Sequence, residues 1–355
     1  MSDVKNKISN LQKELKKKDI DTSLSEPDDF VSTGNYSLDY AITGSFFKGA
    51  IPNRRLTMFS GTSGSGKSFL LGNVAKNSQE KGRFVIYIDT ENAIDTNFLT
   101  NIGVELNENW FLPIRVSTLE ELTDITSNLF KNFDDEKLTV IVDSLSMVSL
   151  EDEEKEFEKG ELGEDRGREA KKRKQYLKNV NAKIGDKDIV FLVSTHTYVN
   201  QDPRNGKGAY IVSGGEAQLY IPSLTIMLNK LKLKEAQESK GIRMKYEIFK
   251  NRIRPSVGFS GEIQVRFDEG MQPYYGLMDL LQNMGLIKVN GPWKSYINKD
   301  GEEVKFQNKD FENHYMNILE AYNPEEHEVY YYEAPIDEED EEISTNNLNM
   351  PSDDE

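Results

Sequence analysis

The sequence contains no cysteine, which excludes disulfide bonds, thiolate metal sites and a cysteine nucleophile. Only three histidines are present, and His196, His314 and His327 are too far apart to indicate a structural zinc site. No run of about 18 apolar residues exists, so no membrane span is expected. The polar first ten residues lack the apolar core of an export signal. We expect a cytoplasmic protein whose 355 residues form one large domain and a smaller one, or two domains.

Charge is distributed unevenly along the chain. The formal net charge is −17, but residues 324–355 contain thirteen acidic residues and no lysine or arginine. The rest of the chain therefore has a formal net charge of only −4, which is compatible with a local basic path for nucleic acid. The acidic tail itself is expected to be disordered.

Strand-like and helix-like segments alternate between residues 56 and 267. The candidate strands are Leu56–Ser60, Phe84–Asp89, Leu138–Asp143, Ile189–Ser194, Leu224–Leu228, Met244–Lys250 and Glu262–Phe267. The candidate helices are Lys67–Gln79, Asp95–Ile102, Leu119–Phe133 and Glu169–Ile184. Continuous apolar runs such as Val85–Ile88 suit strands buried on both faces, so the pattern predicts an α/β fold with a mostly parallel, helix-covered sheet. The last two strands lack an intervening helix, which favours an antiparallel extension.

Four other regions depart from this alternation. Residues 1–30 contain an amphipathic helix on a linker, and its apolar stripe is expected to dock on its own body or on a neighbour. Two long polar stretches, Leu150–Arg168 and Tyr198–Ala217, are predicted to be functional or disordered loops. Residues 271–323 are predicted to form a small α/β module that contains Trp293.

The clearest motif lies between a predicted strand and a predicted helix. It consists of Gly61, Thr62, Ser63, Gly64, Ser65, Gly66, Lys67 and Ser68. Glycines allow backbone N–H groups to turn towards phosphate oxygens, and the helix N-terminus adds a positive dipole end. Lys67 is expected to reach the β- and γ-phosphates, and Ser68 to hold Mg²⁺ through its hydroxyl. The motif therefore predicts a site for ATP with Mg²⁺.

Two acidic residues at strand ends are candidates for the same site. Asp143 ends the apolar run Leu138–Val142, where it would support Mg²⁺ through water or simply cap the next turn. Glu91 follows a second buried strand, and a carboxylate there can orient and activate the attacking water. An ordinary strand-end acid is the alternative interpretation of Glu91.

Three basic or titratable residues extend the candidate site. His196 ends a third strand, where it is either a sensor of the γ-phosphate or a structural histidine. Lys250 and Arg252 form a basic cluster at the end of a later strand. They either act like arginine fingers on a neighbouring subunit's phosphate or belong to a solvated turn.

These motifs, in this order, resemble the RecA family of recombinases from about Ser32 to Trp293. Besides the phosphate-binding loop, the matching segments are Ser32-Thr33-Gly34, Ser37-Leu38-Asp39, Ile88–Asp95, Ser213–Ala217 and Gly291–Tyr296. The resemblance implies a RecA-type P-loop NTPase core in which Glu91 is the catalytic glutamate. It also implies that Asp95 and Phe98 contact the adenine, and we count Phe69 among the nucleotide contacts. Lys250 and Arg252 match basic residues that reach ATP across the filament interface.

The identity of residue 196 distinguishes between branches of the family. The bacterial proteins usually have glutamine as the phosphate sensor, whereas histidine in this context resembles the UvsX-type phage recombinases. The long charged insertion after Asp143 favours the same branch. If the protein is phage-encoded, the host cytoplasm is its expected location.

The resemblance also places the path of DNA on the two irregular stretches, at about Glu151–Arg168 and Tyr198–Ser213. Phosphates would be neutralised by Arg166, Arg168, Arg204 and Lys207, and bases would pack against Tyr198 and Tyr210. The run Lys171–Lys174 is either a solvated face or a further DNA contact. The acidic tail either solubilises the protein or competes with DNA for a basic groove.

Together these features predict four segments: an assembly helix and linker (1–30), an ATPase core with DNA-binding loops (31–270), a small C-terminal domain (271–323) and an acidic tail (324–355). The expected function is that of a DNA-dependent ATPase that forms helical filaments on single-stranded DNA and exchanges strands with homologous duplex DNA. A loading mediator and a single-strand-binding protein are further expected partners. The alternatives are a RecA-like ring helicase and a non-catalytic recombination mediator.

Overall fold

The computed structural model describes residues 2–17, 25–161, 166–199, 210–212, 218–231 and 241–323. At its centre is a ten-stranded sheet of order β12-β11-β10-β9-β3-β7-β6-β4-β5, with β8 paired to the end of β7. The strands are β3 (Arg55–Gly61), β4 (Phe84–Asp89), β5 (Phe111–Arg115), β6 (Leu138–Asp143), β7 (Ile189–Val199), β8 (Tyr210–Val212), β9 (Leu224–Lys230), β10 (Gly241–Asn251), β11 (Ser260–Arg266) and β12 (Gly270–Met271). Six of them, from β9 to β5 in this order, are parallel, and β10 to β12 extend the sheet in antiparallel fashion. The predictions of a mostly parallel sheet and of an antiparallel extension are both confirmed.

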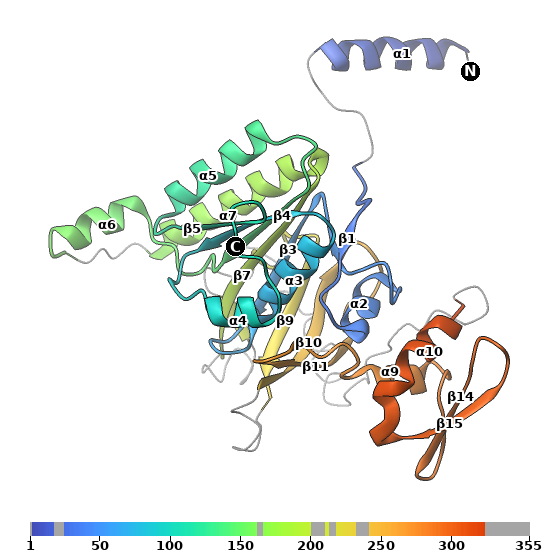
Figure 1. Ribbon diagram of the computed structural model, residues 1–355. Helices are drawn as coiled ribbons and strands as arrows, with labels where there is room; N and C mark the ends of the chain where they lie inside the picture. The colour runs from blue at the N-terminus through green and yellow to red at the C-terminus, as the bar shows by residue number, and fades with distance from the viewer. Residues whose placement is uncertain are drawn as a thin grey trace, which may run out of the picture.

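Helices cover both faces of this sheet (Figure 1). One face carries α2 (Tyr36–Thr43), α3 (Lys67–Glu80) and α4 (Thr96–Asn101), and the other carries α5 (Leu119–Asn132) and α7 (Arg166–Lys183). Alternate residues of β6 pack against the helices on opposite faces of the sheet. Ile141 packs in the cluster that includes α3, whereas Val140 and Val142 pack in the cluster of α5 and α7. This double burial explains why the strand is a continuous apolar run.

An edge strand and a helix are among the elements that were not predicted from the sequence. The edge strand β5 contains Pro113 and leaves Leu112 46% exposed, so it lacks the buried apolar run of its neighbours. Helix α2 begins after Asn35, whose side chain accepts a hydrogen bond from the backbone N–H of Leu38 at 3.0 Å. It ends at Gly44, which adopts the left-handed conformation with φ 73°.

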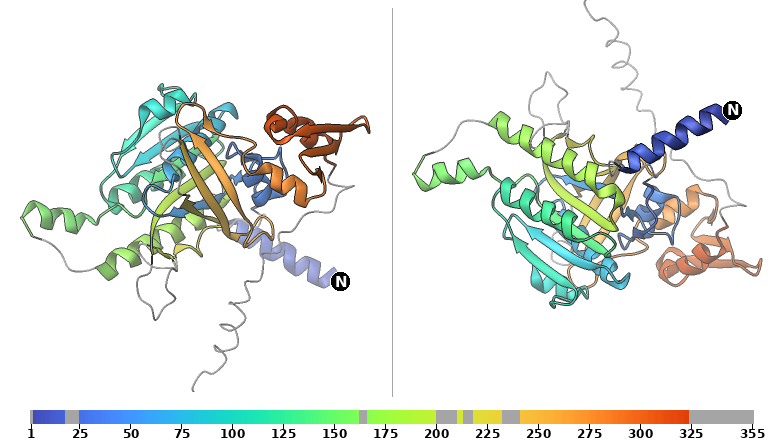
Figure 2. Two further views of the ribbon diagram at one scale, coloured as in Figure 1. Left: turned by 90° about the horizontal axis from the view of Figure 1, so that it is seen from below. Right: turned by 90° about the horizontal axis from the view of Figure 1, so that it is seen from above.

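The predicted loop at Leu150–Arg168 is wrong in its main part, because residues Glu151–Glu158 form helix α6 and α7 already begins at Arg166. All four residues of the first turn of α6 are acidic, and negative charge stabilises the N-terminal end of a helix dipole. The carboxylate of Glu153 also accepts the backbone N–H of Leu150 at 2.9 Å. Helix α6 projects from the body of the protein (Figures 1 and 2).

After β12 the chain forms a small C-terminal unit. It consists of α9 (Leu277–Asn283), the antiparallel strands β13 (Lys288–Asn290), β14 (Trp293–Ile297) and β15 (Glu303–Gln307), and α10 (Tyr315–Ala321). Tyr296, Phe306 and Phe311 are buried in its core, and the ring centroids of the first two lie 5.9 Å apart. The expected small α/β module is therefore present, while the exact domain boundaries remain a prediction.

The N-terminal helix α1 (Ser2–Lys17) lies apart from the body (Figure 1). Its apolar residues Ile8 and Leu11 are 50% and 53% exposed. Nothing in the described part of the chain covers this stripe, so the prediction that it docks elsewhere stays open. None of the described helices is both long enough and apolar enough to cross a membrane.

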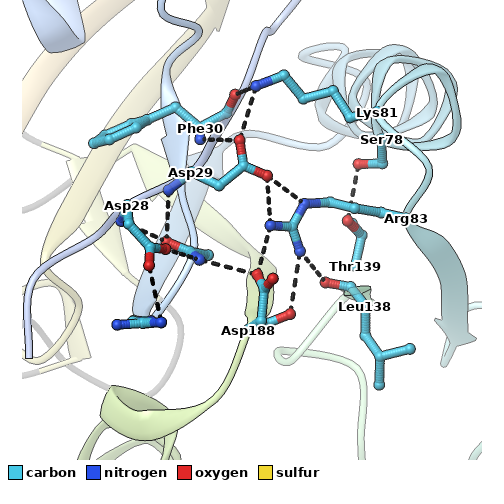
Figure 3. A network of polar contacts seen from close by, with 11 residues as sticks. Asp28, Asp29, Phe30, Ser78, Lys81, Arg83, Leu138, Thr139 and Asp188 are labelled. Carbon is cyan, nitrogen blue, oxygen red and sulfur yellow. Dashed lines mark hydrogen bonds and ion pairs between the residues drawn. The ribbon is translucent and has the colours of Figure 1, made fainter. Parts of the chain in front are cut away.

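A buried ion network joins the amino ends of the central strands (Figure 3). Arg83 is fully buried just before β4 and donates hydrogen bonds of 2.6 Å to the carboxylates of both Asp29 and Asp188. It also donates to the backbone carbonyls of Leu138 and Asp188. Burial alone would raise the pKa of Asp29, but hydrogen bonds from Lys81 and Arg83 lower it to about 2. The network therefore fixes the segment before β1 (Phe30–Val31) to the starts of β4, β6 and β7.

Candidate active site

The glycine-rich loop connects β3 to α3 in a conformation that needs its glycines. Gly64 and Gly66 have positive φ values of 69° and 95°, and Gly66 lies directly before the first turn of α3. At Gly61, a Cβ atom would come within 2.4 Å of the carbonyl oxygen of Leu228 on the neighbouring strand. The loop thus turns tightly over the sheet and leaves the N-terminus of α3 available to an anion.

The parallel register brings the other candidates to the same edge. Gly61 pairs with His196 on β7, and Asp89 at the end of β4 pairs with Asp143 at the end of β6. Because these strands are parallel and adjacent, their carboxyl ends lie side by side. Sequence segments more than 100 residues apart therefore contribute to one site.

A chain of three side chains crosses this edge. The ammonium group of Lys67 lies 3.3 Å from Nδ1 of His196, and Nε2 of His196 lies 2.9 Å from a carboxylate oxygen of Glu91. A neutral imidazole protonated at Nε2 satisfies both contacts, since it donates to Glu91 and accepts from Lys67. His196 thus links the lysine of the loop to the predicted catalytic glutamate.

The pKa values of Lys67 and Glu91 depend on the groups around them. Lys67 is only 5% exposed, and burial lowers its pKa although Asp143 and Glu91 act in the opposite direction. The hydrogen bond from His196 lowers the pKa of Glu91, with burial opposing it. Lys67 also donates to the carbonyls of Gly61 and Thr62, both at 3.0 Å. A buried cation held by neutral groups is well placed to receive a phosphate.

Asp143 is 7% exposed and lies between two hydroxyl groups. Tyr87 donates to one carboxylate oxygen at 2.9 Å, and Ser194 donates to the other. Burial, together with this carboxylate, raises the pKa of Tyr87 well above its usual value. Asp143 is therefore held as an acceptor of hydrogen bonds at the floor of the site.

The predicted metal donors are compatible with Mg²⁺. Ser68 is exposed at the start of α3, and Asp143 supplies carboxylate oxygens at the end of β6, which is separated from β3 by β7. Over the described ranges, no group of three or more His, Cys, Asp or Glu side chains could hold a metal ion. Mg²⁺ usually keeps several waters and shares phosphate oxygens, so a sparse oxygen set of this kind fits it.

Asp89 is a site residue that sequence reasoning missed. Its carboxylate accepts the backbone N–H groups of Glu91 and Ala93, both at 3.0 Å, and of Ile94 at 3.2 Å. These bonds hold the turn that carries Glu91, in which Asn92 has a φ of 53°. The available signal was an aspartate at a strand end, since aspartate often accepts the N–H groups of the turn that follows it.

The residues predicted to contact adenine lie beside the loop. The carboxylate of Asp95 caps α4 by accepting the N–H of Phe98 at 2.9 Å. The ring of Phe98 is 5% exposed and packs edge-on against Phe69, with centroids 4.6 Å apart. Both aromatic residues thus form part of a packed wall, and their contact with a nucleotide remains a prediction.

Lys250 and Arg252 are not brought to this edge within one chain. Lys250 pairs with Thr225 on β9, which in turn pairs with Met58 on β3. Gly61 lies three positions after Met58, which is about 10 Å along the strand, and Arg252 lies further still towards the amino end. Burial and then the charge of Arg252 lower the pKa of Lys250 to about 8. The Arg252 side chain is exposed.

The predicted DNA contacts are only partly described. Tyr198, near the end of β7, is 60% exposed, and Arg168 forms an ion pair of 2.7 Å with Asp152 of α6. Arg166 begins α7 and Tyr210 begins β8, but their side chains lie outside the described set. Arg204 and Lys207 lie entirely outside the described residues.

The basic run Lys171–Lys174 does not form a uniform surface. Arg173 is 4% exposed and donates to the carbonyls of Ser146 at 2.9 Å and Val148 at 2.7 Å. Neither a solvated role nor a DNA contact therefore applies to Arg173. It instead fixes the segment after β6 to helix α7.

Comparisons with known proteins agree with this geometry. The sequence model of the family described as "RecA N-terminal domain" matches residues 3–272. The chain is 27% identical to the Protein RecA of Aquifex pyrophilus over 306 residues, which are 84% of this chain and 82% of that protein. It is 27% identical to the Protein RecA of Aquifex aeolicus, with 79% and 78% covered. For the Protein RecA of Chloroherpeton thalassium the identity is 26%, with 76% and 72% covered.

Proposed function

Because this chain belongs to the RecA family, we propose that it is an ATP-dependent recombinase. It forms filaments on single-stranded DNA and promotes pairing and strand exchange with homologous duplex DNA. The observation that carries the proposal is the contact chain from Lys67 through His196 to Glu91. These contacts join a phosphate-binding cation to a carboxylate that can activate water. His196, the residue between them, lies on a strand that continues towards a candidate DNA loop.

Each residue then has a role in hydrolysis. Lys67 binds the β- and γ-phosphates, and Glu91 orients the attacking water and accepts its proton. The new bond from the water oxygen to the γ-phosphorus forms as the bond to the oxygen of the leaving nucleotide breaks. Ser68 and Asp143 would hold Mg²⁺, which supplies neutralisation of phosphate charge when it is bound. His196 responds to the γ-phosphate, since a phosphate at Lys67 competes for the ammonium that His196 contacts. Asp89 positions Glu91 through the backbone of the turn.

The position of Lys250 and Arg252 fits an ATP site shared by two subunits. They lie two strands away from β3, at the level of its middle and amino-terminal residues rather than at the loop of their own chain, and Arg252 is exposed. In a head-to-tail assembly, such residues can reach the nucleotide of the next subunit. An added cation near the γ-phosphate stabilises the charge of the transition state.

DNA would lie along the end of the sheet beyond His196. Strand β7 runs two residues past His196 to the exposed ring of Tyr198, which is available to stack on a base. Arg166, Arg168, Arg204, Lys207 and Tyr210 are the further proposed contacts. Helix α6 is too acidic for a phosphate path, so the first DNA segment is now proposed to begin after it rather than at Glu151.

We assign the chain to the UvsX-type branch within this proposal. Histidine at position 196 and the inserted helix α6 support that assignment. The exposed stripe of α1 supports a role in subunit assembly, and the acidic residues 324–355 are proposed to weaken DNA binding at low salt.

ATP hydrolysis with and without single-stranded DNA, together with electron microscopy of the same mixtures, tests the proposal. Wild type should hydrolyse ATP faster with DNA and form helical filaments on it, and Lys67→Ala should lose the hydrolysis. Closed rings would favour a ring helicase. Absence of DNA-stimulated hydrolysis would favour a non-catalytic mediator.

A further inference from the structure

The turn after β10 is fixed to α2 by a set of side-chain hydrogen bonds. The side-chain amide of Asn251 donates to the carbonyl of Ile42 at 2.8 Å, and its oxygen accepts the N–H of Ile253 at 2.8 Å. Arg252 lies between these two turn residues, and its backbone N–H donates to Ser223 at 2.9 Å. The backbone of Arg252 is thus held, whereas its exposed side chain projects from the turn.

Arg254 makes the second attachment of this turn. Its guanidinium donates to the carbonyl of Tyr40 at 3.0 Å and lies over the Tyr40 ring at 5.1 Å from the centroid. Gly44 makes room for it, because a Cβ at that position would lie 3.1 Å from the guanidinium carbon. Tyr40 itself is fully buried, so Arg254 contacts a rigid part of the core.

Tyr40 also connects the turn to the small C-terminal unit. Tyr322, directly after α10, lies with its ring centroid 6.4 Å from Tyr40 and 5.4 Å from Phe46. Nearby, the ring of Tyr36 on α2 lies 5.8 Å from Tyr315 on α10. Helix α2 therefore lies between the sheet and the C-terminal unit (Figures 1 and 2).

We propose that Arg254 is a positioning residue that holds Lys250 and Arg252 for the nucleotide of the neighbouring subunit, and that the small C-terminal unit supports it through Tyr322 and Tyr40. The inference rests on the proposed function, since it assumes that ATP is shared between subunits. It adds a residue that contacts no nucleotide and a physical route from the C-terminal unit to the ATP site. The route consists of direct contacts within one chain.

A second arginine provides a matched control. Arg243 lies on β10, the strand that leads into the turn, over the ring of Tyr275 at 5.6 Å, and donates to the carboxylate of Glu262 at 3.2 Å. Like Arg254 it combines a hydrogen bond with a position over a tyrosine ring, although its acceptor is a carboxylate, and it lies eight or more positions from the turn. Loss of Arg243 should disturb packing to a similar degree without moving Arg252.

The first experiment measures DNA-stimulated ATP hydrolysis and nucleotide binding in the full chain. Arg254→Gln should lower kcat by about tenfold or more, because small misplacement of a group at a reacting centre is costly. ATP affinity of the unassembled protein should stay within about twofold, since Arg254 lies away from its own loop. Arg254→Lys, which retains the cation, should recover most of the activity, and Arg243→Gln should behave as wild type. Equal kcat in Arg254→Gln and Arg243→Gln would overturn the proposal.

Mixing experiments separate this inference from the proposed function. Arg252→Ala and Lys67→Ala are defective on opposite sides of a shared site, so a mixture contains some interfaces with both sides intact. In a random equal mixture roughly one quarter of interfaces are complete, given head-to-tail contacts. Hydrolysis restored in this mixture supports the shared site, and none would overturn the proposed cross-subunit function.

The same mixing is then done with Arg254→Gln and Lys67→Ala. Restoration to the same level is expected, because Arg254→Gln should damage only the donating side. If the first mixture is restored and the second is not, the positioning role of Arg254 is wrong while the shared site stands. Tyr322→Ala tests the contribution of the C-terminal unit. It should lower kcat in the same direction and be rescued in the same mixture, and an unchanged kcat would remove that unit from the route.

Discussion

The two ends of the central sheet use buried cations in opposite ways. At the amino end, Arg83 is surrounded by two carboxylates and two backbone carbonyls, so its charge is compensated within the chain (Figure 3). At the carboxyl end, Lys67 meets two carbonyls and a histidine nitrogen, and none of its described hydrogen-bond partners is a carboxylate. The charge of Arg83 at the amino end is therefore compensated by groups of the folded chain. The charge of Lys67 at the carboxyl end remains available to an incoming phosphate.

The sharpest way to test this contrast is Glu91→Gln at the carboxyl end. The amide has nearly the same shape but cannot accept a proton from water, so kcat should fall by about 10²–10⁴-fold. The free energy of unfolding should change little, because the side chain of Glu91 is 29% exposed and solvent screens its contact with His196. Steady-state hydrolysis and urea unfolding measure the two effects. Glu121→Gln, a carboxylate that caps α5, is the control and should retain kcat.

Arg83→Met at the amino end should instead lower stability and leave kcat unchanged. It leaves two carboxylates without their buried partner, so the free energy of unfolding should drop by about 3–5 kcal/mol. The kcat of the molecules that remain folded should be preserved. Lys81→Met is the matched control, because Lys81 bonds to the same Asp29 but is 39% exposed, and its loss should cost about 0–1 kcal/mol. Equal losses for the two variants would contradict the contrast.

The parallel core and its loop were predictable because their signals are local. The apolar runs of β4 and β6 follow from burial on both faces, and the glycines of the loop follow from the φ values that its turn requires. The strand-end acids Glu91 and Asp143 were placed correctly at one edge, because parallel strands share their carboxyl ends.

Part of what the sequence did not show depends on contacts between residues far apart in the chain. Arg83 and Arg173 look like ordinary basic residues, and only the fold brings carboxylates and carbonyls around them. Helix α6 was mistaken for a loop because its acidic residues were weighed as charge rather than as a favourable first turn of a helix. The edge strand β5 was missed because one side of it faces solvent.

Lys250 provides a smaller effect that depends on pH. Burial and the charge of Arg252 lower its pKa to about 8, so the cationic form is present below pH 8 and is lost above it. If the cation acts on a neighbour's phosphate, kcat/KM should fall by up to about tenfold per pH unit above that value. Lys250→Arg keeps its charge throughout, so its profile should stay flat over the same range. Coincident profiles for the two proteins would show that this charge is not used.

The smallest expected effect is the acid response of the amino end. The pKa of Asp29 is about 2 in the folded protein and about 3.9 in an unfolded chain. A lowered pKa means that the unfolded chain binds the proton first, so this contribution to stability is complete above about pH 4 and is lost as pH falls towards 2. Asp29→Asn should be less stable than wild type at pH 5, and the difference should shrink as pH approaches 2.5. Urea midpoints of the two proteins measure this. A constant difference would show that the carboxylate of Asp29 does not carry the acid sensitivity, and that the compensation of Arg83 rests on Asp188 instead.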